Sequence, residues 1–342
     1  MIRFGVIGCG GISRWHINAL SGIPYAKLKI VCDEAPDKAR AIAEEFGVEH
    51  CSDANKLIES GLVDAVCICT PSWLHAGLCI KALGCGLHVA SEKPLAITRD
   101  SLKEVLLAEK SSGKKLMAIS QLRYGDDMKY AKTIIESGKL GKITMVDLSM
   151  KYYRDPSYYT NVPWRGKLSM DGGGALMNQG IHGVDLMRWL CGDLDKVYCF
   201  SKTLSHNIEA EDTLSAAFTL KNGGLGALTA TTSCYPGHER RMEILGTEGS
   251  LRLVEDTLVY VNIKNGENFE SARTQPSGAS DPLAINYELH KLQLEDFTLC
   301  IQNDMPSPLD GEEASKTLGI IFSLYESAEK GLPVEVAKME RA

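Results

Sequence analysis

The sequence predicts an α/β protein of two domains: a doubly wound parallel sheet, then an α+β domain with a large, open, mostly antiparallel sheet. Up to about residue 120, short apolar runs alternate with helical stretches, a pattern typical of a parallel sheet with helices on both faces. Later apolar runs are joined by turn signals rich in glycine, which indicates antiparallel strands. We therefore expect one domain over residues 1–120 and another over residues 121–342.

Each expected element follows from these runs. First-domain strands are expected at residues 2–7, 28–32, 63–69, 87–90 and 116–119, with helices at 12–20, 37–46, 74–83 and 101–112. A helix at 126–137 precedes second-domain strands at 143–153, 197–204, 212–220, 224–232, 240–245, 250–254 and 257–263. Helices at 176–190, 284–301 and 312–331 complete that domain, and the polar stretch 265–281 is expected to be flexible.

Composition narrows the class of protein. A net charge of −7 offers no basic patch and argues against a nucleic-acid partner. No apolar segment is long enough for a transmembrane helix, and Met1 leads directly into the first strand, so no signal peptide is expected. The 11 cysteines lack CxxC spacing and several fall in expected strands, which favours buried thiols in a reducing cytoplasm. Cys67 and Cys69 have no complementary ligand pair, so no metal site is expected.

A glycine-rich turn joins the first strand to the first helix. Glycines there allow a pyrophosphate close to the backbone, and the following helix N-terminus offers free N–H groups. The third small position of such a dinucleotide-binding turn is Ser13, which still permits close packing. The residues expected to hold the cofactor here are Gly8, Gly10, Gly11 and Ile12.

Asp33 ends the second strand, about 20 residues beyond the glycines. In this type of nucleotide-binding sheet, called the Rossmann fold, an acid at that position accepts from the adenosine ribose. Because a carboxylate repels a 2′-phosphate, NAD is favoured, while Lys38 and Arg40 leave NADP possible. A turn or N-cap role is the alternative for Asp33.

Glu92-Lys93-Pro94 follows a later strand of the same sheet. Thr70 and Pro71 follow another, so the candidate residues gather at the carboxyl edge, where such sheets bind ligands. Lys93 would stand beside the nicotinamide. A surface lysine is the alternative.

In the second domain, Gly172-Gly173-Gly174 precedes a helix with three polar residues. Asn178, His182 and Asp185 have the spacing i, i+4 and i+7, so they are expected to share one face. The glycines would allow backbone and ligand to approach closely. The alternative is a core histidine paired with Asp185.

Together these residues resemble the Gfo/Idh/MocA oxidoreductases over nearly the whole chain. The matching motifs are Gly8-x-Gly10-x-x-Ser13, Thr70-Pro71-x-x-x-His75, Glu92-Lys93-Pro94, Arg123-Tyr124 and the segment from Gly172 to Asp185. The resemblance implies NAD(P)-dependent transfer of hydride between nicotinamide and a secondary hydroxyl of a sugar or cyclitol. It also implies a cis Lys93–Pro94 bond.

The resemblance maps the family's lysine to Lys93 and its active-site histidine to His182. The family often has aspartate where this chain has Asn178, a change that suggests the branches acting on nucleotide-linked or acidic sugars. Since oxidation of an alcohol needs a base poised near neutral pH, we assign His182 as proton acceptor and Lys93 as the group that stabilises the alkoxide. The reverse assignment is the close alternative.

Other residues are expected to complete the site. Thr70, Pro71 and His75 would flank a ribose, and Glu92 is grouped with the cofactor-binding residues. Substrate contacts are expected from Gln121, Arg123, Tyr153, Trp164, Arg165, Asn178 and His182. Arg165 could bind a carboxylate or phosphate as a bidentate fork, or belong to a structural ion pair.

Two other functions stay open at this point. One is reduction of a substrate that is not a sugar, such as a dihydrodiol or a biliverdin-like molecule. The other is a non-catalytic dinucleotide sensor, against which the presence of both Lys93 and His182 argues. The open sheet of the second domain is expected to form a homodimer or homotetramer.

Overall fold

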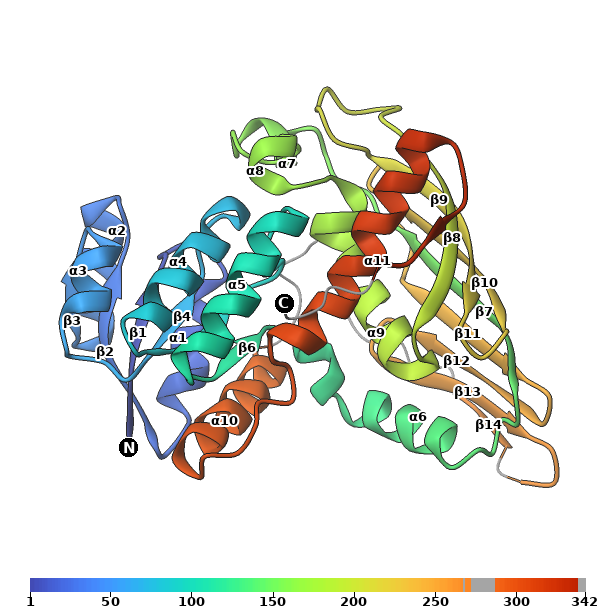
Figure 1. Ribbon diagram of the computed structural model, residues 1–342, viewed down its shortest axis with the longest axis horizontal. Helices are drawn as coiled ribbons and strands as arrows, with labels where there is room; N and C mark the ends of the chain where they lie inside the picture. Colours follow the sequence, from blue (N-terminus) through green and yellow to red (C-terminus); the bar gives the residue numbers. More distant parts are fainter. Residues whose placement is uncertain (267, 272–286, 338–342) are drawn as a thin grey trace. The chain divides into compact units, whose positions relative to one another are not determined.

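The computed structural model describes residues 1–266, 268–271 and 287–337 and divides into two compact units (Figure 1). The first unit comprises Met1–Gln121 together with helix α10 (Glu288–Gln302) and the chain as far as Ser315. The second contains the remaining described residues. A division at residue 120, as predicted from the sequence, leaves α10 with the second domain.

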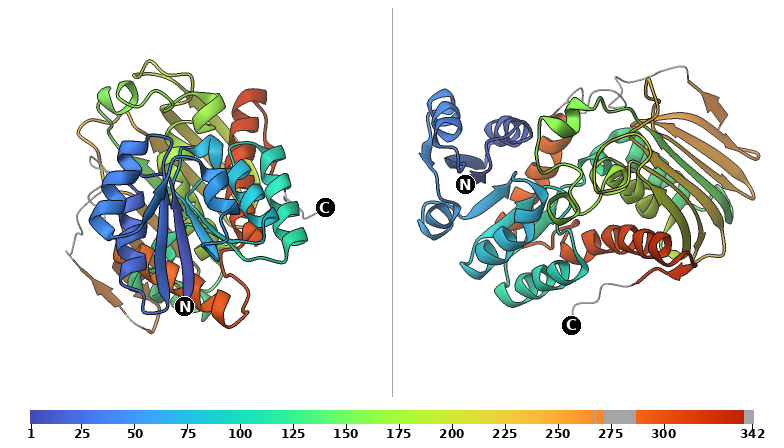
Figure 2. Two further views of the ribbon diagram at one scale, coloured as in Figure 1. Left: turned by 90° about the vertical axis from the view of Figure 1, so that its left-hand side faces the viewer. Right: turned by 90° about the horizontal axis from the view of Figure 1, so that it is seen from above.

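The first unit is built on a six-stranded parallel sheet with helices on both faces (Figure 2). Its order is β3-β2-β1-β4-β5-β6, the Rossmann arrangement, so the predicted fold is confirmed. The strands are β1 (Ile2–Ile7), β2 (Ala26–Cys32), β3 (Glu49–Cys51), β4 (Ala65–Ile68), β5 (His88–Ser91) and β6 (Leu116–Ala118). The helices are α1 (Ser13–Ser21), α2 (Pro36–Phe46), α3 (Ala54–Glu59), α4 (Ser72–Gly84) and α5 (Arg99–Ser112).

Sequence signals explain where these helices begin and end. Pro36 opens α2, where its missing N–H costs nothing, and Gly47 closes it in the left-handed conformation. Thr98 caps α5 by accepting a hydrogen bond from the Ser101 amide. The sequence analysis missed β3 and α3, because a three-residue strand that begins Glu-His carries no apolar run.

The second unit contains a nine-stranded sheet of order β14-β13-β12-β11-β7-β10-β9-β8-β15. Among the described strands of this sheet, only the β7–β10 pair is parallel, which confirms the predicted mostly antiparallel sheet. The strands are β7 (Ile143–Lys151), β8 (Leu194–Lys202), β9 (Thr213–Leu220), β10 (Leu225–Thr231), β11 (Arg241–Gly246), β12 (Gly249–Val254), β13 (Thr257–Ile263), β14 (Asn268–Glu270) and β15 (Val334–Glu335).

Helices cover one face of this sheet (Figure 1). Along β9, Leu214 and Phe218 are buried while Ser215 and Ala217 are exposed, the alternation of a sheet with one solvent face. The helices of this unit are α6 (Asp126–Glu136), α7 (Ser157–Thr160), α8 (Leu168–Asp171) and α9 (Ile181–Cys191), with a π-helical turn η2 (Ala175–Gly180) before α9. The long helix α11 (Gly311–Lys330) begins in the first unit and belongs to the second from Lys316 onward.

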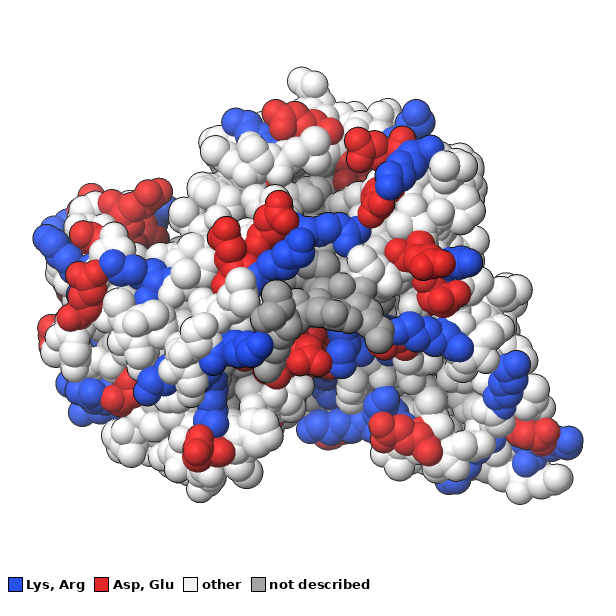
Figure 3. All heavy atoms as spheres, viewed as in Figure 1, with Lys and Arg blue, Asp and Glu red and all other residues white. Residues whose placement is uncertain are grey.

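Charged side chains of both signs are interspersed on the face drawn in Figure 3. Among the described residues, no helix is long and apolar enough to cross a membrane. The stretch 265–281, expected to be flexible, includes the short strand β14, whereas residues 267 and 272–281 lie outside the described residues.

Candidate functional site

The carboxyl edge of the first unit's sheet carries the polar residues predicted for the cofactor. Gly8 follows β1, Asp33 follows β2 and Lys93 follows β5. The neighbours β1 and β4 form the point where the strand order reverses, and open parallel sheets bind ligands at such a point. Gly8 has a φ of 96°, and a Cβ there would lie 2.5 Å from the carbonyl oxygen of Cys69. This position therefore requires glycine.

The glycine loop leads directly into α1. Ile12 occupies the N-cap position and supplies no side-chain cap. Ser13 Oγ donates to the carbonyl of Gly10 at 2.6 Å, which turns the hydroxyl back into the loop. A Cβ at Gly10 would meet no heavy atom within 4 Å, so the loop is open on that side. An uncapped helix N-terminus behind an open glycine loop fits a dinucleotide pyrophosphate.

Backbone hydrogen bonds set the position of Asp33. Its Oδ2 accepts from the Cys9 amide at 2.8 Å and its Oδ1 accepts from the Ala35 amide at 2.9 Å. Each oxygen keeps a second lone pair that could accept from a ribose hydroxyl. Nearby, Arg40 is engaged by Asp37, which partly neutralises a cation that could otherwise attract a 2′-phosphate. The arrangement fits NAD.

His75, from α4, joins two of the strand ends. Its Nδ1 lies 2.7 Å from the carbonyl oxygen of Pro94, and its Nε2 lies 2.8 Å from that of Thr70. The side chain is buried, and burial lowers the pKa of His75. The imidazole therefore positions the carbonyl of Pro94, the residue that follows the Lys93–Pro94 peptide bond. That bond is cis, as the resemblance implied. A contact between His75 and the ribose stays a prediction.

Two buried polar atoms at this edge have no hydrogen-bond partner within the described residues. They are Oγ1 of Thr70 and Oε1 of Gln121. Since native structures leave few buried polar atoms unpaired, both are positions where a bound ligand could supply the missing partner. This observation supports the assignment of Thr70 to the cofactor and of Gln121 to the substrate, which both stay predictions.

Glu92 and Lys93 point in different directions, as alternation beyond a strand predicts. Lys93 is half-buried, whereas Glu92 is only 6% exposed. Glu92 Oε1 lies 2.8 Å from Nε2 of His16, and its Oε2 accepts from the Lys93 amide at 3.2 Å. The carboxylate of Glu92 is therefore buried against His16 and the Lys93 amide. The expected role of Glu92 in binding the cofactor rests on the resemblance alone.

In the second unit, the glycine run before α9 is required by the protein's own packing. Gly172 has a φ of 76°, a left-handed conformation that closes α8. A Cβ at Gly173 would collide with the hydroxyl of Tyr325, and one at Gly174 would collide with the carbonyl oxygen of Glu211. Close approach of these two residues thus accounts for Gly173 and Gly174. Close approach of a ligand, the reason expected from the sequence, stays a prediction.

The helix expected over residues 176–190 begins as a π-helix. The turn η2 spans Ala175–Gly180, and α9 proceeds from Ile181. Asn178 therefore lies in the π turn and His182 in the α-helix, so the regular helix predicted from residue 176 is wrong. That the two side chains share one face stays a prediction. The hydrophobic pattern did not indicate the π turn. Such turns are rare and frequently occur at functional sites.

Asp185 is engaged by two residues that the sequence analysis did not pair with it, Arg123 and Thr317. Its carboxylate accepts two hydrogen bonds from Arg123, at 2.7 Å from Nε and 2.5 Å from Nη2. A third comes from Oγ1 of Thr317 at 2.9 Å. Arg123 and Asp185 are both buried, so this ion pair anchors α9 and holds the helix that carries His182. A direct contact of Arg123 with substrate stays a prediction.

A cluster of aromatic and polar side chains lies around Asn178. Tyr158 stacks under the Arg165 guanidinium, whose Cζ is 3.9 Å from the ring centroid. Gln179 donates to the Tyr158 hydroxyl at 2.7 Å, and Asn178 donates to Asp171 at 2.7 Å. Trp164 also approaches Arg165, with 5.8 Å between Cζ and the ring centroid. The structure thus brings together three predicted substrate residues: Trp164, Arg165 and Asn178.

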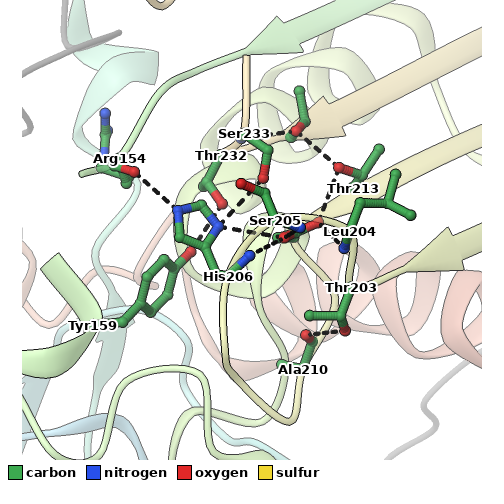
Figure 4. Close-up of polar contacts among 12 residues, drawn as sticks. Arg154, Tyr159, Thr203, Leu204, Ser205, His206, Ala210, Thr213, Thr232 and Ser233 are labelled. Atoms are coloured by element: carbon green, nitrogen blue, oxygen red, sulfur yellow. Dashed lines mark hydrogen bonds and ion pairs between the residues drawn. The ribbon is translucent and has the colours of Figure 1, made fainter. Parts of the chain in front are cut away.

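The segment that carries Tyr158 is held by a network around His206 and Asp212 (Figure 4). His206 Nε2 lies 2.9 Å from the Arg154 carbonyl oxygen, and the Tyr159 ring packs against the imidazole. Asp212 accepts from the amides of Leu204, Ser205 and His206. Burial would raise the pKa of Asp212, but these amides outweigh it and lower the pKa to about 2.

The sequence analysis missed residues that these networks contain. Tyr158 and Gln179 could have been found from the density of aromatic and amide residues around Arg165 and Asn178. Tyr153, expected to contact substrate, packs against Tyr235 with 5.2 Å between ring centroids, and its contact with substrate stays a prediction. No local signal marks His16, because its contact with Glu92 joins positions 76 residues apart.

Comparison with known proteins agrees with this geometry. The family described as oxidoreductases with an NAD-binding Rossmann fold matches residues 2–120, and the GFO/IDH/MocA C-terminal domain matches residues 128–252. The scyllo-inositol 2-dehydrogenase (NAD(+)) of Bacillus subtilis is 26% identical, covering 98% of this chain and 96% of its own.

Two solved structures are more similar in sequence. The WlbA dehydrogenase of Bordetella pertussis, in complex with NADH and UDP-GlcNAcA, is 32% identical with a TM-score of 0.85, covering 98% of this chain and 99% of its own. The WlbA dehydrogenase of Chromobacterium violaceum, with the same two ligands, is 30% identical with a TM-score of 0.87, covering 98% and 96%. With both family domains matched in order, this chain belongs to the Gfo/Idh/MocA family of NAD-binding oxidoreductases.

Proposed function

We propose that this protein is an NAD-dependent dehydrogenase that oxidises a secondary hydroxyl of a nucleotide-linked sugar carrying a carboxylate. The broader class, NAD-dependent dehydrogenases of sugars and cyclitols, follows from relatives that include inositol 2-dehydrogenases. The narrower class is supported by the two WlbA dehydrogenases, which bind UDP-GlcNAcA and share 32% and 30% of their residues with this chain.

The observation that carries the narrower proposal is the environment of Arg165. Its guanidinium is held by Tyr158, both by the ring and by a 3.0 Å hydrogen bond from Nη1 to the backbone carbonyl. Its Nε is buried and has no hydrogen-bond partner among the residues the structure describes. A guanidinium fixed in place with an unused donor suits a carboxylate or phosphate. Asn178, in place of an acid, adds no negative charge that would repel such a substrate.

The residues of the chain would divide the chemistry between them. When bound, NAD accepts the hydride from the carbon that bears the hydroxyl. His182 would take the hydroxyl proton, and the carbon–oxygen single bond becomes a carbonyl. Lys93 would donate a hydrogen bond to the same oxygen and stabilise the charge that develops on it. In the alternative assignment, the two side chains exchange these roles.

A substrate panel tests the proposal directly. NADH formation is followed with UDP-linked uronic acids, the corresponding neutral UDP-sugars, free sugars and inositols. We expect the highest kcat/KM with the UDP-linked acids. A preference for inositol or a free sugar would contradict the narrower class. No turnover with any member, despite tight NAD binding, would favour the sensor or the non-sugar reductase.

A variant of Arg165 tests the residue that carries the argument. In Arg165→Met, we expect the ratio of kcat/KM for acidic over neutral UDP-sugar to fall by about 10-fold to 100-fold, since a hydrogen bond to a charged group contributes about 1.5–3 kcal/mol. Lys167→Met, which removes an exposed cation two residues away, should leave the ratio unchanged. An unchanged ratio in Arg165→Met would show that a residue other than Arg165 binds the acid group of the substrate.

We further propose that two copies associate through the open face of the second unit's sheet, as a dimer or as part of a tetramer. Leu245, Met145 and Leu225 are register partners on adjacent strands and form an exposed apolar row. Met145→Glu should therefore lower the molar mass measured by light scattering, and an unchanged mass would exclude this face.

The 11 cysteines are all free thiols, which supports the reducing cytoplasm as the compartment.

A further inference from the structure

Three buried side chains from distant parts of the sequence meet inside the first unit. His16 lies in α1, Glu92 follows β5 and His290 lies in α10. Their exposed fractions are 0%, 6% and 1%. One ligand atom from each, a histidine nitrogen or a carboxylate oxygen, lies within 4.8 Å of the other two. We call these residues the His–Glu–His cluster.

Hydrogen bonds within the unit do not satisfy this cluster. Nε2 of His16 lies 2.8 Å from Oε1 of Glu92, but Nε2 of His290 lies 3.7 Å from the same oxygen. Nδ1 of His16 and both ring nitrogens of His290 have no hydrogen-bond partner among the described residues. Because an unpaired buried polar atom costs about 1–3 kcal/mol, a group that engages these nitrogens would stabilise the fold.

The chemistry of the three side chains also points to a cation. Histidine nitrogen and carboxylate oxygen are metal ligands in their deprotonated forms. Glu92 brings a carboxylate into a buried site whose other two side chains are imidazoles. An ion that binds all three groups would offset the cost of burying them.

The geometry matches the requirements of a small transition-metal ion. Zinc binds histidine nitrogen and carboxylate oxygen at about 2.0–2.2 Å, so ligand atoms around a tetrahedral zinc lie about 3.3 Å apart. The separations of 2.8 Å and 3.7 Å from Glu92 Oε1 lie on either side of that value. Calcium and magnesium prefer all-oxygen ligands, whereas a donor set of two imidazoles and one carboxylate suits zinc.

We propose that the His–Glu–His cluster binds one Zn²⁺ ion, through His16, Glu92 and His290, with water as the fourth ligand. The ion would tie together α1, the end of β5 and α10. It would add to the hydrogen bonds of Gln293 with Ala118 and Ser120, which already hold α10. Since Oε2 of Glu92 also accepts from the Lys93 amide, the ion would anchor the turn that carries Lys93. Its role would be structural, and the proposal is independent of the substrate.

Metal analysis of untagged protein from zinc-supplemented cells tests the proposal. After dialysis, we expect about one zinc per chain in the wild type, as the three-ligand site predicts. In His290→Gln the zinc should be lost, and its affinity measured against a chromophoric chelator should fall by more than about 100-fold, since even outer-shell changes cost 10-fold to 100-fold. The matched control is His50→Gln, which removes an exposed histidine of the same unit and should keep the zinc.

Wild-type protein provides a second measurement in case His290→Gln does not fold. The metal is removed with a chelator and the protein is titrated with Co²⁺, whose visible absorption reports tetrahedral nitrogen and oxygen ligands. We expect a saturable spectrum at one Co²⁺ per chain and a higher thermal midpoint with Zn²⁺ than without it. A folded wild type that holds no zinc and gives no cobalt spectrum would overturn the proposal. Equal zinc in His290→Gln would do the same.

Discussion

The two units position their candidate functional residues in different ways. In the first unit, Gly8, Asp33 and Lys93 each follow a strand of one parallel sheet, and backbone geometry aligns them. In the second unit, Asn178 and His182 lie on a π turn and the helix after it, and side-chain hydrogen bonds hold Asn178 and the helix that carries His182. A strand end needs only the sheet to place a residue. A helix inserted between strands needs specific partners, here Arg123 for Asp185 and Tyr325 for the glycine run.

A unit of this first kind can bind the same cofactor in proteins that act on different substrates. The edge of a parallel sheet is a general place for a nucleotide. The cluster around Arg165 depends on the loop between β7 and α8, and loops vary more than the elements they connect. The following variants probe each half in turn.

The largest effect is expected at His182. If it accepts the hydroxyl proton, His182→Asn should lower turnover by about 10²-fold to 10⁴-fold, the usual contribution of a general base. Oxidation by the wild type should rise with pH through a histidine-like pKa, because only the neutral imidazole accepts a proton. This rise should vanish in His182→Asn and persist in Lys93→Met. NAD affinity and near-ultraviolet circular dichroism serve as controls for folding. A rise that persists in both variants would exclude His182 as the base.

Lys93 tests the catalytic group of the first unit. Lys93→Met preserves length and removes the charge, so turnover should fall by roughly 10²-fold or more if the ammonium stabilises the developing alkoxide. The dissociation constant of NAD, measured by fluorescence titration, should change little. Lys103→Met, an exposed lysine in α5, should behave as wild type. Near-normal turnover of Lys93→Met on the true substrate would show that the motif is structural.

Asp212 tests whether a side-chain network holds the second unit's loop. Its pKa in the folded state, about 2, lies below the unfolded value of about 3.9. The carboxylate therefore stabilises the fold above about pH 4, and this stabilisation is lost as the pH falls from about 4 to 2. Asp212→Asn should lower the free energy of unfolding by about 2 kcal/mol at pH 7 and by less at pH 3. Urea unfolding measures both values, with Glu239→Gln as an exposed control. Equal losses at the two pH values would contradict this account.

The smallest effect concerns Asp33 and the choice of cofactor. NAD should bind more tightly than NADP, because the carboxylate accepts from a 2′-hydroxyl and repels a 2′-phosphate. Asp33→Ala should narrow the ratio of the two dissociation constants by about tenfold, equivalent to about 1.4 kcal/mol. Glu34→Ala removes an exposed neighbouring acid and should leave the ratio unchanged. Tighter binding of NADP by the wild type would overturn the assignment.

The fold class and most strands of both sheets could be predicted from the amino-acid sequence. Alternating apolar runs, glycines at turns and the acid after β2 are local signals, and local signals suffice where a strand end defines the position. They also sufficed to recognise the family, because its motifs recur in order along the chain. The strand β3 was not predicted, because a strand of three residues without an apolar run is too short to show the alternation of apolar and polar residues.

The contacts between residues far apart in the sequence could be seen only in the tertiary structure. The π turn at Asn178, the engagement of Asp185 by Arg123 and the return of α10 to the first unit all depend on packing against elements far away in the chain. The His–Glu–His cluster depends on the same return, since His290 is supplied by α10. Periodicity describes one element at a time, so it cannot show which buried groups from separate elements will share one site.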